Sequence, residues 1–240
     1  MHAGLRRGHG WRVGPGLTRR YDVVTFDRYG TLIDWESGIA GWFAEAARAD
    51  GISLTREQIL AFYAEIEPAV EAEAYRSYRN VLTETALRIA GRFDWPLTRD
   101  KAQGLAASLP AWRPFPDTNR ALERLATAGY RLGILSNVDD DLFAGTRLHL
   151  APPFELLVTA QQVRSYKPAP GHFEEARRRI GNGRWLHAAQ SHFHDIVPCR
   201  ALGIPVAWVN RKAELARDPR PDFEIPNLAD FAARLDPTSG

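Results

Sequence analysis

The chain alternates short apolar runs with longer segments in which apolar positions recur at helical spacing. The first run, residues 21–27 (YDVVTFD), is β-branched and aromatic, and a glycine-containing turn follows it at once. This pattern predicts a buried parallel strand that ends at Asp27. Four later runs have the same character and also end in polar residues: 131–136 (RLGILS), 154–159 (FELLVT), 185–190 (WLHAAQ) and 205–210 (PVAWVN).

Helical patterns separate these runs. Residues 118–128, 171–180 and 195–202 have helical character, and a glycine closes each segment. The alternation of strand and helix predicts an α/β fold, a doubly wound parallel sheet with right-handed crossovers. Such sheets bind ligands at the carboxyl ends of their strands, so we expect Asp27, Ser136 and Gln190 to converge there.

About a hundred residues without a strand-like run separate the first two predicted strands. Helix patterns occupy residues 37–50, 55–73, 81–93 and 99–108. One helix suffices for a crossover, so the extra ones predict an inserted helical bundle, a cap domain at 35–112. The α/β core domain is then expected at 21–34 and 113–240, and Pro110, Pro114 and Pro116 mark the return to it.

The first twenty residues are rich in arginine and glycine and lack the apolar stretch of a secretory signal. Their composition predicts a disordered extension. A basic interaction arm is the alternative.

The composition is that of an ordinary globular protein, with 45% hydrophobic and 25% charged residues in 240. A net charge of +2 comes from 31 basic and 29 acidic residues that are interspersed along the chain. This balance gives no field that predicts a nucleic-acid partner, whereas a small anionic substrate fits it.

The apolar runs are only strand-length, which argues against a membrane span. The single cysteine, Cys199, cannot form an internal disulfide, and the chain has no zinc-binding cysteine pattern. We therefore expect a soluble, cytoplasmic protein. Exposed apolar stripes on the cap helices could pair two subunits in a homodimer.

The most informative stretch is DRYGTL, residues 27–32. A carboxylate at a strand end, held by the amides of a tight turn, is fixed in a geometry suited to nucleophilic attack. The alternative is that Asp27 only caps the turn, as Asp often does.

The stretch resembles the hallmark of the haloacid dehalogenase superfamily, an Asp nucleophile in a DxxGT turn, which Asp27, Gly30 and Thr31 match. The phosphatase branches usually carry a second Asp two residues after the nucleophile, as the acid that protonates the leaving group. This chain has Tyr29 there, whose ordinary pKa near 10 makes it a poor acid. A departing halide needs no proton, and the DxYGTL form looks like the 2-haloacid dehalogenase branch.

Two further motifs follow in the family's order. Ser136 and Asn137, in ILSNVDD, match the pair that hydrogen-bonds the nucleophile and the anionic group of the substrate. Lys167, in SYKPAP, matches the lysine whose ammonium orients the nucleophile. Without the first motif, a polar turn and a solvated lysine would explain these residues equally well.

The fourth motif separates the branches. Metal-dependent phosphatases have GDxxxxD there, whereas this chain has Gln190 in place of the first acid and keeps Asp195 as the second. Because Mg²⁺ binds through carboxylates, the loss favours a metal-free reaction. The resemblance implies that Asp195 positions the hydrolytic water. It leaves open whether His192 or His194 touches that water.

The family's halide-binding cap arginine has no counterpart, because residues 62–65 read FYAE in that register. Arg76, Arg79 and Arg28 are the candidate replacements, with a solvated helix charge as the alternative for each. Together with the strand-end residues, substrate binding is predicted for Arg28, Tyr29, Arg76, Arg79, Gln190, Ser191 and His192.

The motifs together predict a hydrolase that removes halide from short 2-haloalkanoic acids through an Asp27 ester, with no metal or other cofactor. The predicted catalytic residues are Asp27, Thr31, Ser136, Asn137, Lys167 and Asp195. The small-molecule carboxylate and water would be the partners, with no nucleic acid or membrane. The alternatives are a Mg²⁺-dependent phosphatase of the same fold and a catalytically idle protein that binds a small acid.

Overall fold

The computed structural model describes residues 19–215 and 217–236. The predicted N-terminal extension therefore lies, except for residues 19 and 20, outside the described part of the chain. The described residues form one six-stranded parallel sheet with the order β3-β2-β1-β4-β5-β6. The strands are β1 (Val23–Phe26), β2 (Arg131–Ser136), β3 (Leu156–Thr159), β4 (Trp185–Ala189), β5 (Val206–Val209) and β6 (Phe223–Ile225).

The predicted fold class is confirmed, and the strand that carries Asp27 is central in the sheet. β1 lies between β2 and β4, with Phe26 in register with Ile134 and Ala188. All four residues of β1 are buried, as expected for a strand covered on both faces. β6 at the sheet edge was not among the predicted strands.

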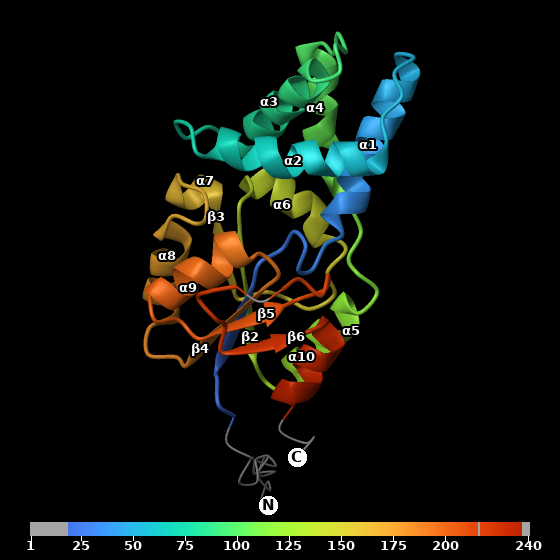
Figure 1. The fold of residues 1–240 in the computed structure, drawn as a ribbon. Helices are drawn as coiled ribbons and strands as arrows, with labels where there is room; N and C mark the ends of the chain where they lie inside the picture. Colours follow the sequence, from blue (N-terminus) through green and yellow to red (C-terminus); the bar gives the residue numbers. More distant parts are fainter. Residues whose placement is uncertain (1–18, 216, 237–240) are drawn as a thin grey trace, which may run out of the picture.

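Helices cover both faces of the sheet (Figure 1). Two separate apolar clusters result: Phe26 packs edge-to-face against Phe231 of α10 in one, and Phe173 of α8 lies with Trp208 in the other. The core helices are α5 (Thr118–Thr127), α6 (Asp140–Arg147), α7 (Ala160–Val163), α8 (Gly171–Ile180), α9 (Val197–Ala201) and α10 (Leu228–Leu235). The segment predicted as one helix at 195–202 instead begins with a π-helical turn, η2 (His192–Ile196), that leads into the short α9.

The insertion between β1 and β2 is helical, as predicted, and lies at one end of the sheet (Figure 1). Side chains cap its helices: Thr55 and Gln58 form a reciprocal capping box at α2, and Ser77 caps α3, which begins three residues before the predicted start. Its elements are α1 (Trp35–Ala49), α2 (Arg56–Glu71), α3 (Tyr78–Gly91), α4 (Arg99–Ser108) and the 3₁₀ turn η1 (Leu109–Ala111). No helix among the residues described is long and apolar enough to cross a membrane.

Candidate active site

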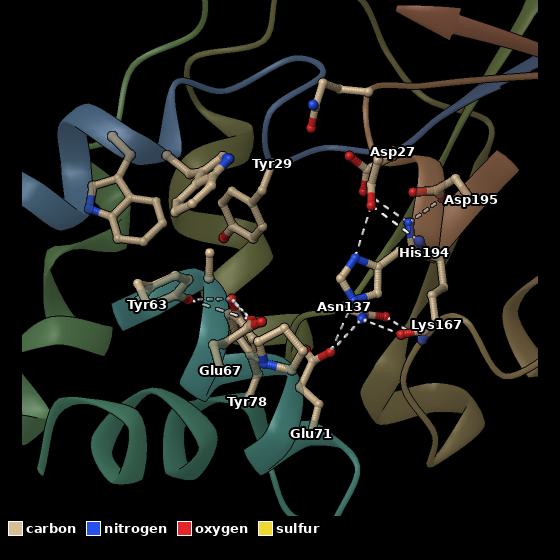
Figure 2. A pocket seen from close by; sticks show the side chains of 16 residues that line it. Asp27, Tyr29, Tyr63, Glu67, Glu71, Tyr78, Asn137, Lys167, His194 and Asp195 are labelled. Atoms are coloured by element: carbon tan, nitrogen blue, oxygen red, sulfur yellow. Dashed lines mark hydrogen bonds and ion pairs between the residues drawn. The ribbon is translucent and has the colours of Figure 1, made fainter. Parts of the chain in front are cut away.

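A cavity of about 210 Å³ lies between the carboxyl ends of the strands and the inserted helices (Figure 2). Both parts of the chain contribute to its wall. The core supplies Asp27, Tyr29, Asn137, Lys167, Gln190, Ser191, His194 and Asp195. The insertion supplies Trp35, Tyr63, Ala64, Glu67, Pro68, Glu71, Tyr78 and Trp112.

Asp27 lies directly after β1, and both of its carboxylate oxygens are held. Thr31 donates from Oγ1 to Oδ2 at 2.9 Å, and Lys167 donates from Nζ to Oδ1 at 2.9 Å. The turn between Asp27 and Thr31 requires a glycine, because Gly30 has φ +87°. The carboxylate is thus oriented by a local hydroxyl and a distant ammonium, and its remaining surface faces the cavity.

Lys167 is buried between two acids. Its ammonium donates to Asp27 Oδ1, to Asp195 Oδ1 at 2.7 Å and to the Leu135 carbonyl at 3.1 Å, which uses all three protons. Burial alone would lower the pKa of Lys167, but the charges of Asp195 and Asp27 outweigh it and raise that pKa. The ammonium is therefore a permanent positive charge at the strand ends.

The backbone of Lys167 is held in turn by Asn137. Lys167 N donates to Asn137 Oδ1 at 2.8 Å, and Asn137 Nδ2 donates back to the Lys167 carbonyl at 3.1 Å. The strand end after β2 thus positions the lysine that reaches the strand end after β1.

Asp195 lies in the η2 turn and is fully buried. Its Oδ1 accepts from Lys167 and from His187 Nε2 at 3.0 Å. Burial alone would raise the pKa of Asp195, but the Lys167 charge and the bond from His187 hold it well below its usual value. Asp195 Oδ2 has no hydrogen-bond partner within the described part of the chain, so one acceptor remains for a molecule in the cavity.

His187, which was not predicted as a site residue, holds Asp195 from inside the sheet. Its Nδ1 lies 2.8 Å from Thr25 Oγ1, which also accepts from Trp185 Nε1 at 2.7 Å. The hydroxyl proton of Thr25 is then directed to Nδ1, which leaves the proton of His187 on Nε2, facing Asp195. The one signal in the sequence is a histidine inside the apolar run WLHAAQ.

The cavity wall opposite Asp27 carries the carboxyl groups of glutamates and the hydroxyl groups of tyrosines. Glu67 on α2 accepts at Oε1 from Tyr78 OH at 3.1 Å and from Tyr63 OH at 3.5 Å. Burial raises the pKa of Glu67 to about 7. Burial, followed by the charge of Glu67, raises the pKa of Glu71 well above its usual value. This group was not predicted from the sequence, although Tyr63, Glu67 and Glu71 repeat every four residues on one helix face.

Of the predicted substrate-binding residues, Tyr29, Gln190 and Ser191 line the cavity. Arg28 does not, because it is fully buried behind Tyr29, with its guanidinium carbon 4.4 Å from the Tyr29 ring centroid. His192 points elsewhere, with Nε2 3.1 Å from the Pro219 carbonyl. His194 lines the cavity, and its Nδ1 lies 3.0 Å from Ser191 Oγ.

Arg76 and Arg79 are not brought to the cavity, which corrects their predicted place in the site. The Asp139 carboxylate accepts from the backbone N–H groups of Tyr78 and Arg79, both at 2.9 Å. This anchored turn directs the Tyr78 side chain inward, while Arg79 extends to Asp141 at 2.6 Å and Arg76 to Glu73. Both arginines therefore neutralise surface acids.

Two predicted catalytic residues, Thr31 and Ser136, are buried and do not line the cavity. Thr31 Oγ1 donates to Asp27 and accepts from the backbone N–H of Gln190 at 2.9 Å. Ser136 is fully buried at the end of β2, and its Oγ has no partner in the part of the chain that is described.

The side chains at the strand ends form a poor set of ligands for Mg²⁺. Mg²⁺ requires near-octahedral oxygen ligands, usually including carboxylates and water. Here the Lys167 ammonium lies between the two core carboxylates, and the amide of Gln190 donates to Glu214 at 3.1 Å. Over residues 19–215 and 217–236, no three His, Cys, Asp or Glu side chains are grouped to hold a metal ion.

The parallel sheet and the buried acids at its carboxyl edge are the architecture of a hydrolase of the haloacid dehalogenase type. The family model for haloacid dehalogenase-like hydrolases matches residues 21–192, and the chain belongs to this family.

Two curated relatives differ in the activity that their names state. The (S)-2-haloacid dehalogenase of Pseudomonas fluorescens is 28% identical over 219 residues, which cover 87% of this chain and 94% of the relative. The glyceraldehyde 3-phosphate phosphatase of Methanothermobacter thermautotrophicus is 31% identical over 214 residues, which cover 82% of this chain and 89% of the relative.

Among solved structures, the L-2-haloacid dehalogenase from Xanthobacter autotrophicus with chloropropionic acid covalently bound matches with a TM-score of 0.77. It is 20% identical, and the match covers 88% of this chain and 97% of that one. This likeness shows a shared fold.

Proposed function

We propose that the protein hydrolyses the carbon–halogen bond of short 2-haloalkanoic acids without a metal, with Asp27 as the nucleophile. One observation carries the proposal: where a magnesium site would need a further carboxylate, the amide of Gln190 donates to Glu214, while Lys167 bridges the acids Asp27 and Asp195. A carboxylate oriented in this way can attack carbon.

The reaction has two steps. An Asp27 oxygen attacks the halogen-bearing carbon, the carbon–halogen bond breaks, and halide leaves with the bonding electrons, so that an ester of Asp27 forms. Water then attacks the carbonyl carbon of this ester, which releases a 2-hydroxy acid and a proton and regenerates Asp27.

Asp195 would orient the water of the second step. Its Oδ2 is buried without a partner from the described residues, while Lys167 and His187 hold Oδ1. Because its pKa is lowered, Asp195 stays ionised and accepts a hydrogen bond from the water.

The cavity supports a small substrate. Its volume of about 210 Å³ is below the range of about 300–1,000 Å³ typical of drug-sized ligands. Trp35 and Trp112 give it apolar walls suited to a haloalkyl chain. The similarity to the (S)-2-haloacid dehalogenase of Pseudomonas fluorescens supports the same substrate class.

A Mg²⁺-dependent phosphatase is the second candidate, favoured by the likeness to the archaeal phosphatase. Tyr29 disfavours it, because burial raises the pKa of its phenol to about 12, so that it is a weak proton donor for a leaving alkoxide.

The discriminating experiment measures halide released from 2-chloropropionate and phosphate released from glyceraldehyde 3-phosphate, each with Mg²⁺ and with a chelator. We expect halide release in both conditions, and none from the Asp27→Asn variant. Phosphate release that the chelator abolishes would establish the phosphatase instead. Binding of 2-chloropropionate without either product would indicate a catalytically idle protein.

A further inference from the structure

We propose that the hydroxyl group of Tyr29, held by the buried guanidinium of Arg28, donates a hydrogen bond to the departing halide. This inference rests on the proposed function and names the groups that take the place of a halide-binding arginine on the inserted helices. Tyr29 contacts the halide, whereas Arg28 acts through Tyr29 and positions it.

The charged donor of the described cavity wall is already used. Lys167 is the one lysine or arginine in that wall, and all three of its protons are directed at protein acceptors. Both amide protons of Asn137 are likewise used within the protein. A halide that leaves carbon therefore needs a different donor.

Arg28 is fully buried, and no carboxylate of the described residues is hydrogen-bonded to it. Its Nη2 donates to the Tyr29 hydroxyl at 2.6 Å and to the hydroxyl of Thr146, while Nε and Nη1 have no partner among the residues described. Its guanidinium carbon lies 4.4 Å from the ring centroid of Tyr29 and 5.1 Å from that of Phe143. Because arginine stays protonated in proteins and a buried charge without a counterion is costly, Arg28 favours an anion in the adjoining cavity.

The bond from Arg28 determines what the Tyr29 hydroxyl can do. A guanidinium only donates hydrogen bonds, so the phenol oxygen is the acceptor in this pair and its own proton is directed elsewhere. Among the described residues, Arg28 is the hydrogen-bond partner of this hydroxyl, and none accepts its proton. Burial raises the pKa of Tyr29 to about 12, so the phenol keeps that proton at neutral pH. Tyr29 is therefore a donor that a bound anion can use.

Tyr29 lies between the nucleophile and the inserted helices. Its ring lines the cavity and extends from the turn after Asp27 toward Tyr63 and Tyr78 (Figure 2). Two rings fix this direction: Trp112 packs edge-to-face with centroids 5.5 Å apart, and Tyr78 is stacked at 6.3 Å. In a displacement at carbon the leaving group departs on the side away from the attacking oxygen. The halide thus leaves Asp27 toward the side of the cavity to which the Tyr29 hydroxyl extends.

The hydrogen bond acts while the carbon–halogen bond breaks. The Asp27 oxygen forms the new C–O bond, and the halide leaves with the electron pair while it accepts from Tyr29; the phenol proton stays on Tyr29. A donor that is itself bound to a cation is most effective where negative charge develops. Chloride concentrates its charge more than bromide does, so cleavage of a carbon–chlorine bond gains more.

The halide fits this donor better than the carboxylate of the substrate does. The Tyr29 hydroxyl offers one proton, which suits a spherical ion, whereas a carboxylate has two oxygens with about four acceptor positions.

The test measures the first-turnover rates of halide release from 2-chloro- and 2-bromopropionate. We expect Tyr29→Phe, which keeps the ring, to lower chloride release about 100-fold, the usual loss for one oriented donor, and bromide release by about 10-fold or less. Arg28→Met removes the cation without burying a new polar group, and it should also lower chloride release more than bromide release. The control is Arg79→Met, which removes a surface guanidinium paired with Asp141 and should match wild type.

A binding measurement separates a group that receives halide from a residue that only supports the fold. Chloride that exchanges with a site on a protein broadens its own ³⁵Cl NMR signal. We expect wild type and Arg79→Met to broaden the signal equally, and Tyr29→Phe and Arg28→Met to broaden it less. Tyr29→Phe decides the question if Arg28→Met fails to fold.

Equal losses of chloride and bromide release in Tyr29→Phe, with a raised KM, would mean that Tyr29 holds the substrate carboxylate and would overturn the inference. Wild-type chloride release and ³⁵Cl broadening in Tyr29→Phe would overturn it as well. Either result leaves the proposed function intact if Asp27→Asn is inactive. Release of neither halide by wild type would instead overturn the proposed function and the inference with it.

Discussion

Lys167 and Asp195 form a fully buried ion pair, with Nζ 2.7 Å from Oδ1, and the same ammonium reaches Asp27 at 2.9 Å. One lysine thus joins the strand ends after β1 and β4. Since isolated buried charges are costly, Lys167 and Asp195 depend on each other for their ionised states.

Replacement of Lys167 by Met should destabilise the protein and abolish activity. The variant leaves Asp27 and Asp195 as two uncompensated buried carboxylates, at a cost of about 3–5 kcal/mol. Urea unfolding measures this loss. The double variant Lys167→Met/Asp195→Asn should recover part of the stability, and a double variant no more stable than the single one would contradict the interpretation.

Replacement of Asp195 by Asn should separate the two chemical steps. The amide keeps the shape of the side chain, but it no longer offers a charged acceptor to the hydrolytic water. We expect one equivalent of halide per enzyme to be released rapidly, followed by slow turnover, and an ester mass that persists on the protein after acid quenching. Loss of the first, rapid release would argue against a role restricted to water.

Because Glu67 is buried in the cavity wall, we expect the free energy of unfolding to depend on pH. The folded-state pKa of Glu67, about 7, lies above the ordinary value of 4.5, so the folded protein binds the proton more tightly than the unfolded chain does. Stability is therefore lost as pH rises from about 4.5 through about 7.

Glu67→Gln removes this titration. Thermal unfolding at pH 8 should show the variant to be more stable relative to wild type than it is at pH 5, by up to about 3 kcal/mol. The same stability difference between wild type and variant at both pH values would show that Glu67 is not buried as a charge.

The turn after Asp27 predicts a contrast between two glycines. An alanine Cβ at Gly30 would require positive φ and would lie 3.0 Å from Gln190 Oε1, whereas a Cβ at Gly41 meets nothing within 4 Å. Gly30→Ala should destabilise by about 1–2 kcal/mol and reduce activity, while Gly41→Ala, inside α1, should stabilise by about 0.5–1 kcal/mol. Denaturant midpoints and halide release check both variants.

The sequence pattern predicted the core strands and the strand-end residues because both depend on local features. Short buried runs bounded by glycine form parallel strands, and their ends converge, which brings Asp27 to Lys167. β6 was missed because it has only three residues, which is too few for a pattern to stand out.

For the inserted helices, the sequence predicts the helices themselves but not the contacts of their side chains. Helical spacing predicts that a helix forms, but not which neighbour its polar residues face. Glu71 therefore escaped notice, although it faces the cavity, while Arg76 and Arg79 looked suitable and lie on the surface. The direction of Arg79 is set by Asp139, sixty residues away in the chain.

The most direct test of the central claim, covalent attack by Asp27, is a single-turnover reaction in H₂¹⁸O with enzyme in excess over 2-chloropropionate. Because the ester transfers an oxygen of Asp27 to the product, the first 2-hydroxy acid formed should contain no ¹⁸O, and the label should be found in the peptide that carries Asp27. Label in the product of the first turnover and none in Asp27 would mean that water attacks the substrate directly, which would contradict the account.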